Sequence, residues 1–392
     1  MGGDVLGLSP IAFQRDRWKT PTPSDASFDL GVDLVCVVDA QGRFIAMNNI
    51  WEERLGWSRD ELQQRTMIEL VHPEDVERTR GLFGIVTDPD AEVQAFENRY
   101  RAKDGGYRWM RWNARSDGSR WFAFASDITE EREREQWLRS VLREEHLAVY
   151  AQPILDQRRM RVSREELLVR LRTGPHGEEV IPPGSFLPDA ERLGLVAIVD
   201  RWMLRKGVEL AARGRAVAVN LSARSIDDRD VREELCEIVE ANPPSPGALV
   251  IELTETAALQ NLDAALDLIE RLEPLGCQFA LDDFGTGFGS LTYLRQLAVQ
   301  YLKIDRSFVS GVTSNPADRS LVRSIIAIAS ELGLLTVAEG VEDGATLNRL
   351  REYGVDYLQG FLIGAPEPLW SPAPIRVWSS SKATDSALPR AL

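Results

Sequence analysis

The stretch FALDDFGTGFGS, residues 279–290, ends an apolar run with two adjacent carboxylates and continues into a glycine-rich segment. An apolar run that is polar only at its end is typical of a buried strand in a parallel sheet. Asp282 and Asp283 are therefore expected at the C-terminal end of a strand, and residues 285–290 as a mobile loop beside them. The pair is either an ordinary strand end followed by a helix cap or part of a metal site.

The same pattern recurs along residues 147–370, where apolar strand-like runs alternate with helical stretches. Three of the helical stretches end in a glycine just before the next run, as helices often do. Repeated strand–helix units of this kind favour a (β/α) barrel, with a doubly wound open sheet as the alternative. Each run is apolar until its end, where a polar residue follows: Asn220, Glu252, Asp282 with Asp283, Lys303, Glu339 and Gln359. The earlier run EELLVR adds Glu166 and Arg170.

The types of these residues indicate a chemistry. In a barrel the C-terminal strand ends converge on one face, where barrel enzymes carry their active sites. Carboxylate and amide oxygens suit Mg²⁺ or Mn²⁺, and adjacent aspartates let one carboxylate bridge two ions about 4 Å apart. Lys303 is suited to orient or deprotonate an attacking water, and Arg170 to contact a phosphate. We therefore interpret Asp282 and Asp283 as the centre of a two-metal site for phosphoryl displacement.

The composition excludes several other functions. The 392 residues carry a formal net charge of −15, which argues against binding to nucleic acid or to an anionic membrane. The three cysteines are far apart and suit a reducing cytoplasm. The sequence shows no signal peptide and no apolar stretch long enough to span a membrane. We therefore expect a cytoplasmic protein with two domains.

The N-terminal third has a different pattern. Residues 1–25 are expected to be a flexible leader and residues 371–392 a tail. Residues 26–129 combine a hairpin, short helical pieces and three alternating strands, which predicts a small α+β domain. Residues 130–146 predict a charged linker helix with an apolar stripe from Trp137 to Leu142. That stripe either packs within the chain or forms a short parallel coiled coil in a dimer.

Residues 147–370 resemble the EAL-domain cyclic-di-GMP phosphodiesterases. The resemblance is carried by the ordered motifs YAQPI, EELLVR, PGSFLPDAERLG, VNLSARS, IELTET, ALDDFGTGFGSLTYL, YLKIDRSFV, VAEGVE and DYLQGF. It implies a modified TIM barrel with one antiparallel strand. It also implies hydrolysis of cyclic-di-GMP to linear pGpG with two Mg²⁺ or Mn²⁺ ions. A relative that binds the dinucleotide without hydrolysing it is the alternative, although such relatives usually lose ligand residues and none is missing here.

The resemblance also assigns roles to individual positions. It implies that a first metal ion is held by Glu166, Asn220, Glu252 and Asp282. Asp282 would bridge to a second ion, held with Asp283 and, through water, Glu339. Lys303 matches the lysine that positions or activates the water between the ions.

Four further positions match supporting roles. Glu255 matches the glutamate that braces the loop after the paired aspartates, and Gln359 matches a residue that supports the metal ligands. Gln152 and Arg170 match positions that contact the substrate. Departures from the family pattern, such as Leu167 in place of the signature alanine, lie outside the metal ligands.

The first block resembles a PAS sensor domain through VVDAQGRFIAMNNIWEERLGWSRDEL, VHPEDVERT and FASDITEERERE. Cys36 lies in a strand and not where a flavin-adduct cysteine would lie, so the ligand of this domain is unknown. Both a ligand-free dimerisation domain and a bound flavin or metabolite remain open. We expect a homodimer, formed through the PAS domains and the helix at 130–146, in which the PAS domain regulates the hydrolase.

Overall fold

The structure is a computed structural model that describes residues 32–83, 91–174, 177–286 and 293–369. The expected leader and tail, and most of the expected loop at 285–290, lie outside the described residues. Contacts divide the chain into two compact units between Gln136 and Trp137. None of the described helices is long and apolar enough to cross a lipid bilayer.

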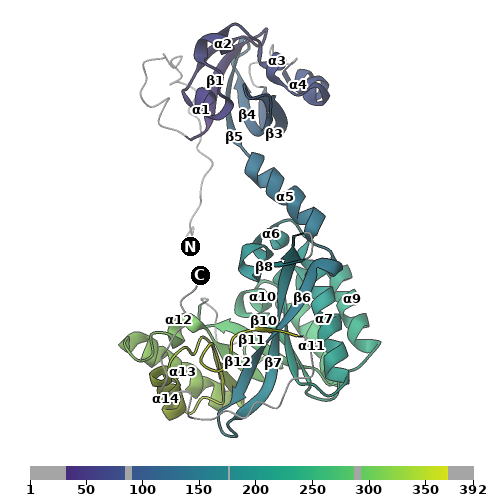
Figure 1. Cartoon of the computed structure of the whole chain (residues 1–392), viewed down its shortest axis with the longest axis vertical. Helices are drawn as coiled ribbons and strands as arrows, with labels where there is room; N and C mark the ends of the chain where they lie inside the picture. Colours follow the sequence, from purple (N-terminus) through teal and green to yellow (C-terminus); the bar gives the residue numbers. More distant parts are fainter. Residues whose placement is uncertain (1–31, 84–90, 175–176, 287–292, 370–392) are drawn as a thin grey trace, which may run out of the picture. The chain divides into compact units, whose positions relative to one another are not determined.

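The first unit contains a five-stranded antiparallel sheet with the order β2-β1-β5-β4-β3 (Figure 1). The hairpin predicted near residue 40 forms from its first two strands, and Gly42 takes the positive φ of 75° that its turn requires. Among the described residues, four α-helices lie between β2 and β3. The strands are β1 Leu34–Asp39, β2 Phe44–Met47, β3 Glu92–Arg101, β4 Tyr107–Ser116 and β5 Arg120–Asp127. The helices are α1 Ile50–Leu55, α2 Arg59–Gln63, α3 Met67–Leu70 and α4 Val76–Phe83.

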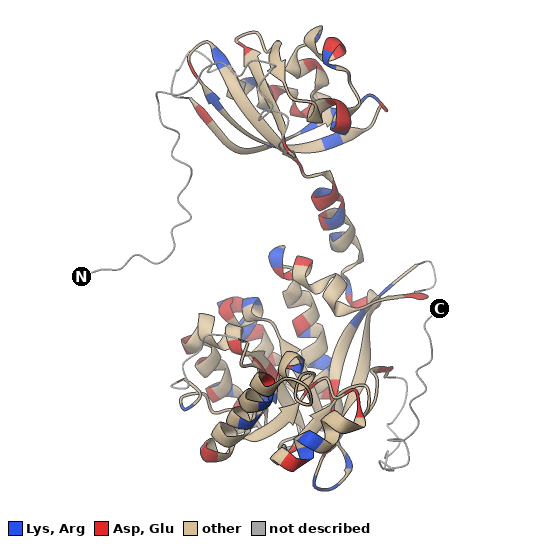
Figure 2. Ribbon diagram, turned by 90° about the vertical axis from the view of Figure 1, so that its left-hand side faces the viewer, with Lys and Arg blue, Asp and Glu red and all other residues tan. Residues whose placement is uncertain are grey.

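Helix α5, Thr129–Val141, spans the division between the units and carries charges of both signs (Figure 2). Its first turns are tied to the sheet of the first unit, because Arg132 pairs with Glu97 of β3. At its other end Leu138 is buried, as is Leu142 just beyond it, in the core of the second unit. The apolar stripe predicted in this segment therefore packs largely within the chain itself.

The second unit is a closed barrel of eight described strands, and it confirms the predicted modified TIM barrel. Its strand order is β6-β14-β13-β12-β11-β10-β9-β7, and pairing of β6 with β7 closes the ring. Strand β6 runs antiparallel to both of its neighbours, whereas the other pairs in the ring are parallel. The strands are β6 Leu147–Asp156, β7 Arg161–Thr173, β9 Val217–Leu221, β10 Leu249–Thr254, β11 Gln278–Phe284, β12 Tyr301–Ile304, β13 Leu335–Ala338 and β14 Tyr357–Gln359. Short strands β8 Glu179–Ile181 and β15 Glu367–Pro368 pair with β7 and β6.

Helices follow most barrel strands. The glycines predicted to end three of the helical stretches, Gly276, Gly333 and Gly354, all adopt a left-handed backbone after a helix or 3₁₀ turn. The described helices of this unit are α6 Leu187–Arg192, α7 Val196–Ala212, α8 Ala223–Asp227, α9 Arg229–Glu240, α10 Glu255–Gln260, α11 Leu262–Leu272, α12 Arg306–Val309, α13 Pro316–Leu332 and α14 Gly344–Tyr353.

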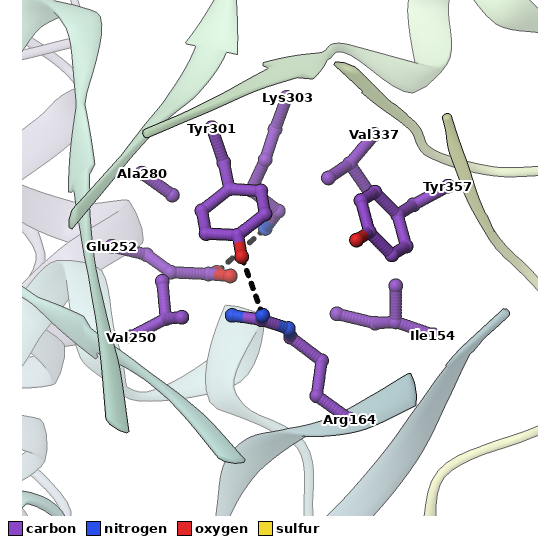
Figure 3. A pocket seen from close by; sticks show the side chains of 9 residues that line it. All are labelled: Ile154, Arg164, Val250, Glu252, Ala280, Tyr301, Lys303, Val337 and Tyr357. Atoms are coloured by element: carbon purple, nitrogen blue, oxygen red, sulfur yellow. Dashed lines mark hydrogen bonds and ion pairs between the residues drawn. The ribbon is translucent and has the colours of Figure 1, made fainter. Parts of the chain in front are cut away.

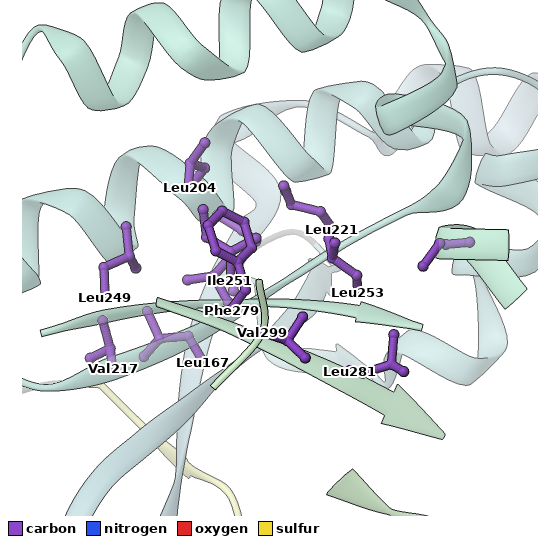
Figure 4. Close-up of a cluster of buried hydrophobic side chains, with 14 of the residues drawn as sticks. Leu167, Leu204, Val217, Leu221, Leu249, Ile251, Leu253, Phe279, Leu281 and Val299 are labelled. Carbon is purple, nitrogen blue, oxygen red and sulfur yellow. The ribbon is translucent and has the colours of Figure 1, made fainter. Parts of the chain in front are cut away.

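The core of this unit has two parts, because successive side chains of a strand point to opposite faces. Residues such as Ile251 of β10 and Phe279 of β11 pack outward against Leu204 of α7 (Figure 4). Each fully buried side chain of this size stabilises the fold by about 1.5–3 kcal/mol. A smaller apolar cluster fills the inside of the ring: Ile154, Ala218, Val250, Ala280, Tyr301 and Val337. The next inward position along several of these strands is polar, and that layer forms the site.

Candidate active site

Lys303 lies at the centre of the polar layer inside the barrel. It belongs to β12, and its side chain is only 1% exposed. Its Nζ lies 2.6 Å from Glu252 Oε2 and 2.6 Å from Glu339 Oε1. The same atom lies 3.0 Å from Asp282 Oδ2 and 3.8 Å from Glu166 Oε2. One buried ammonium therefore contacts or neighbours four carboxylates that come from four different parts of the sequence.

The register of the strands explains this convergence. Glu252 of β10 pairs with Asn220 of β9, so the two side chains lie at the same level of the ring. Lys303 follows Tyr301 by two residues on β12, and Tyr301 is part of the apolar layer inside the barrel. Because side chains alternate along a strand, a residue two positions further on points to the same side. The polar residues at these strand ends are thus carried into the barrel interior.

Asp282 and Asp283 would point to opposite faces in a regular strand, yet the structure brings both to one group. Asp283 adopts a left-handed backbone with φ 54°, and the pairing of β11 with β12 shifts register between Leu281 and Phe284. Aspartate tolerates this conformation better than most residues do. As a result, carboxylate oxygens of Asp282, Asp283 and Glu339 lie within 4.8 Å of one another, close enough to hold a metal ion.

The electrostatics of this acidic group are those of crowded, poorly solvated carboxylates. Burial, with repulsion from Asp282, raises the pKa of Asp283 to about 6. Burial also raises the pKa of Glu339 to about 8, although Lys303 opposes the shift. Burial would lower the pKa of Lys303, but the surrounding carboxylates outweigh it and hold that pKa well above its usual value. The group is therefore short of positive charge, which a divalent cation would supply.

Amide side chains surround Glu166 on β7. Nε2 of Gln359 donates to Glu166 Oε2 at 2.6 Å, and Nδ2 of Asn220 donates to Glu166 Oε1 at 2.6 Å. Gln359 also donates to Gln152 Oε1 at 3.3 Å, and Gln152 donates to the carbonyl of Gly364 at 3.1 Å. The structure thus brings Gln152, Gln359 and Asn220 together with the carboxylates as one connected set.

Two of the predicted site residues stand apart from the acidic group. The guanidinium of Arg170 lies 5.0 Å from the ring centre of Tyr150 and donates to the carbonyl of Val169. Among the described residues it forms no ion pair with the carboxylates, and burial lowers its pKa. Its place four residues beyond Glu166 on β7 leaves it available for an anionic ligand.

Glu255, the other, begins α10 and is buried. Its Oε2 accepts a hydrogen bond from the backbone N–H of Gly285 at 3.0 Å, two residues beyond Asp283. Its Oε1 accepts from the hydroxyl of Tyr293 at 2.7 Å. The carboxylate therefore binds Gly285 and Tyr293, which lie on either side of residues 287–292; those residues lie outside the described part of the chain. No sequence pattern distinguishes Tyr293, because a tyrosine in LTYL resembles any aromatic residue of a protein core.

The comparison with known families matches this arrangement. The EAL domain family matches residues 135–366, more than half of the chain. The chain belongs to the EAL domain family. The PAS fold matches residues 44–119, so a PAS domain precedes the EAL domain. Both resemblances inferred from the sequence are confirmed.

Curated relatives of the EAL domain include named phosphodiesterases. Cyclic di-GMP phosphodiesterase NbdA of Pseudomonas aeruginosa is 37% identical over 248 residues, which are 62% of this chain and 31% of that protein. Cyclic di-GMP phosphodiesterase PdeF of Escherichia coli is 35% identical over 238 residues, which are 59% of this chain and 31% of that protein. The chain thus spans about a third of the length of these relatives.

Solved structures similar to the EAL domain include complexes with the dinucleotide. The phosphodiesterase PaMucR in complex with c-di-GMP superposes with a TM-score of 0.56 at 33% identity, covering 60% of this chain and 98% of that one. The FimX EAL domain of Pseudomonas aeruginosa bound to c-di-GMP gives a TM-score of 0.55 at 29% identity, covering 60% of this chain and 96% of that one.

Proposed function

We propose that the EAL domain hydrolyses one phosphodiester bond of cyclic-di-GMP, to give linear pGpG, with two divalent metal ions. The observation that carries this proposal is the group of carboxylates around Lys303, in which oxygens of Asp282, Asp283 and Glu339 lie within 4.8 Å of one another. The names of the relatives NbdA and PdeF support the choice of substrate.

The residues present fit Mg²⁺ or Mn²⁺. The donors are carboxylates and an amide, which are the hard oxygen ligands that these ions prefer. We assign the first ion to Glu166, Asn220, Glu252 and Asp282. The second ion is assigned to Asp282, Asp283 and, through water, Glu339. When bound, the ions would neutralise the phosphate and make a water molecule a strong nucleophile.

The protein's own side chains position the reactants. Lys303 carries a protonated ammonium whose pKa is held up by its carboxylate neighbours, so its N–H groups can orient an attacking water. Gln152 and Gln359 hold the Glu166 side of the site, and Arg170 would contact a phosphate of the substrate. Glu255 would keep the chain after Asp283 in position through Gly285.

The test is a turnover assay on the full chain. Purified protein with Mg²⁺ or Mn²⁺ is given cyclic-di-GMP, and pGpG is quantified by chromatography. Hydrolysis should stop when EDTA is added, and Ca²⁺ should inhibit because its longer and looser coordination fits poorly here. Binding of cyclic-di-GMP with no pGpG formed under any metal would favour the alternative, a receptor.

We also propose that the PAS domain regulates this activity within a homodimer. The support for regulation, though not for the dimer, is α5, whose Arg132 is paired with the PAS sheet while Leu138 is buried in the EAL core. Removing residues 1–129 should change the specific activity and leave metal binding intact. An unchanged rate would separate the PAS domain from the mechanism, and a fully active monomer in light scattering would exclude the dimer.

A further inference from the structure

We propose that Arg164, Tyr301 and Tyr357 form a floor inside the barrel that positions the metal-binding and catalytic side chains above it. The inference rests on the proposed function, because it concerns the same site. Each floor residue stands two positions before a residue of the site on the same strand. The pairs are Arg164 with Glu166 on β7, Tyr301 with Lys303 on β12, and Tyr357 with Gln359 on β14.

The floor residues contact one another across the barrel (Figure 3). Nη2 of Arg164 donates to the hydroxyl of Tyr301 at 2.6 Å, and the guanidinium carbon lies 4.3 Å from the centre of the Tyr301 ring. The rings of Tyr301 and Tyr357 meet edge to face, with centres 5.9 Å apart. The Tyr301 hydroxyl in turn donates to Gln278 of β11 at 3.1 Å. Side chains of four strands of the ring, β7, β12, β14 and β11, are thereby joined below the site.

The site repeats this pattern one level higher. Lys303 Nζ lies 3.8 Å from Glu166 Oε2, and Gln359 donates to the same oxygen at 2.6 Å. Strands β7 and β12 are not neighbours in the sheet, so no backbone hydrogen bond sets the distance between them. Two residues of a strand rise by only about 6.5 Å. The Arg164–Tyr301 contact is therefore well placed to set the separation of Glu166 and Lys303.

The floor also borders the site directly. A small cavity of about 10 Å³ lies between Arg164 and Tyr301 on one side and Glu252 and Lys303 on the other. Nε of Arg164 is buried without a hydrogen-bond partner among the described residues. A planar guanidinium stacked on a ring has few alternative positions, and little free space is left around it. A substitution in the Arg164–Tyr301 stack should therefore displace the carboxylates of the layer above it.

Replacing Arg164 would have two opposite effects on metal affinity, one through its charge and one through the position of the ligands. Its positive charge lies below an acidic group that would bind cations, so removing the charge alone should tighten metal binding. Loss of correctly placed ligands should weaken it. Tyr301→Phe changes no charge and keeps the stacked ring, so it tests position alone.

The experiment measures Mn²⁺ binding by calorimetry on the full chain, with thermal unfolding as a check of folding. Arg164→Met should raise the Mn²⁺ dissociation constant about tenfold. This is the lower end of the loss of metal affinity that follows removal of a residue that orients metal ligands. Tyr301→Phe should raise it by a few-fold. Arg161→Met, which removes an exposed arginine from the same strand, should leave it unchanged. In turnover, kcat should fall in both floor variants with KM for cyclic-di-GMP unchanged.

The outcomes separate this inference from the proposed function. Mn²⁺ binding requires no substrate. A chain that binds Mn²⁺ but leaves cyclic-di-GMP intact would refute the proposed hydrolysis, and its Mn²⁺ affinity would still test the role of the floor residues. Unchanged binding in Tyr301→Phe together with unchanged or tighter binding in Arg164→Met would overturn the floor. A wild-type chain that binds no Mn²⁺ would overturn it as well. If Arg164→Met does not fold, Tyr301→Phe alone decides.

Discussion

Lys303 Nζ lies 2.6 Å from Glu252 Oε2, and the two side chains are 1% and 2% exposed. Neither side chain is solvated: burial raises the pKa of Glu252 well above its usual value although Lys303 opposes the shift, and the surrounding carboxylates keep Lys303 charged. Breaking a buried pair by removing one partner typically costs about 3–5 kcal/mol, because the remaining charge stays buried without compensation. Lys303 therefore has a structural role in the metal-free protein besides its proposed part in hydrolysis.

Lys303→Met should destabilise the metal-free protein by about 3–5 kcal/mol, because the surrounding carboxylates lose their buried counter-charge. Mn²⁺ should restore much of this stability, since it supplies positive charge to the same group. Urea unfolding with EDTA and with Mn²⁺ measures both effects. Lys206→Met, at a lysine that is 44% exposed, is the control and should change stability little. Equal stability of Lys303→Met and wild type in EDTA would contradict the assigned role.

Asp282→Asn should lower kcat by about a thousandfold or more, because the variant loses the carboxylate assigned to both metal ions. The change preserves the size of the side chain, so the fold should persist. The measurement is the rate of pGpG formation at saturating Mn²⁺. Asp267→Asn, which alters an exposed carboxylate paired with Arg232, should keep the wild-type rate. Turnover near that rate in Asp282→Asn would refute the two-metal assignment.

Tyr293→Phe should lower kcat by about three- to tenfold, since it removes one hydrogen bond to the buried carboxylate of Glu255. Glu255→Gln should have a larger effect, because the same carboxylate also accepts a hydrogen bond from the backbone N–H of Gly285, two residues beyond Asp283. Initial rates at fixed Mn²⁺ compare the two variants. Tyr353→Phe, at a tyrosine of α14, is the matched control and should keep the wild-type kcat. If neither variant of the Glu255 contact changes kcat, the contact does not position the site.

Mn²⁺ affinity should increase as pH rises from 6 to 8.5. Protons compete with the metal for Asp283, whose pKa is about 6, and for Glu339, whose pKa is about 8. Calorimetric titrations across this range measure the trend. Glu339→Gln should bind Mn²⁺ more weakly, and the part of the pH dependence near 8 should disappear. An affinity that does not change between pH 6 and 8.5 would show that these carboxylates do not titrate as described.

The same raised pKa values predict the stability of the metal-free protein. Between the usual pKa of a carboxyl group and the raised one, the folded state binds more protons than the unfolded state. The contribution of such a carboxyl group to the free energy of unfolding therefore falls as pH rises towards its raised pKa, which is about 8 for Glu339. Denaturation in EDTA should show lower stability at pH 8.5 than at pH 6, and Mn²⁺ should reverse the trend. Stability that rises over this interval in EDTA would contradict the shift.

The barrel could be predicted from the sequence because its signals are local. A strand buried on both faces reads as an apolar run, and a helix that ends in glycine precedes the next run. Asn220, Glu252 and Asp282 stood out because each interrupts such a run near its end. The stripe near Leu138 remained ambiguous, because an apolar face has the same pattern whether its partner is the chain itself or a second copy.

The sequence by itself determined which residue types stand at the strand ends, and hence the oxygen chemistry of the site. Only the tertiary structure decided the left-handed backbone of Asp283, which turns two successive carboxylates to one side. It also decided the contact of Arg164 with Tyr301, which are 137 residues apart. The physical reason is that strand register and ring closure depend on the sum of many long-range contacts. No local pattern in the sequence records which side chains meet across the inside of a barrel.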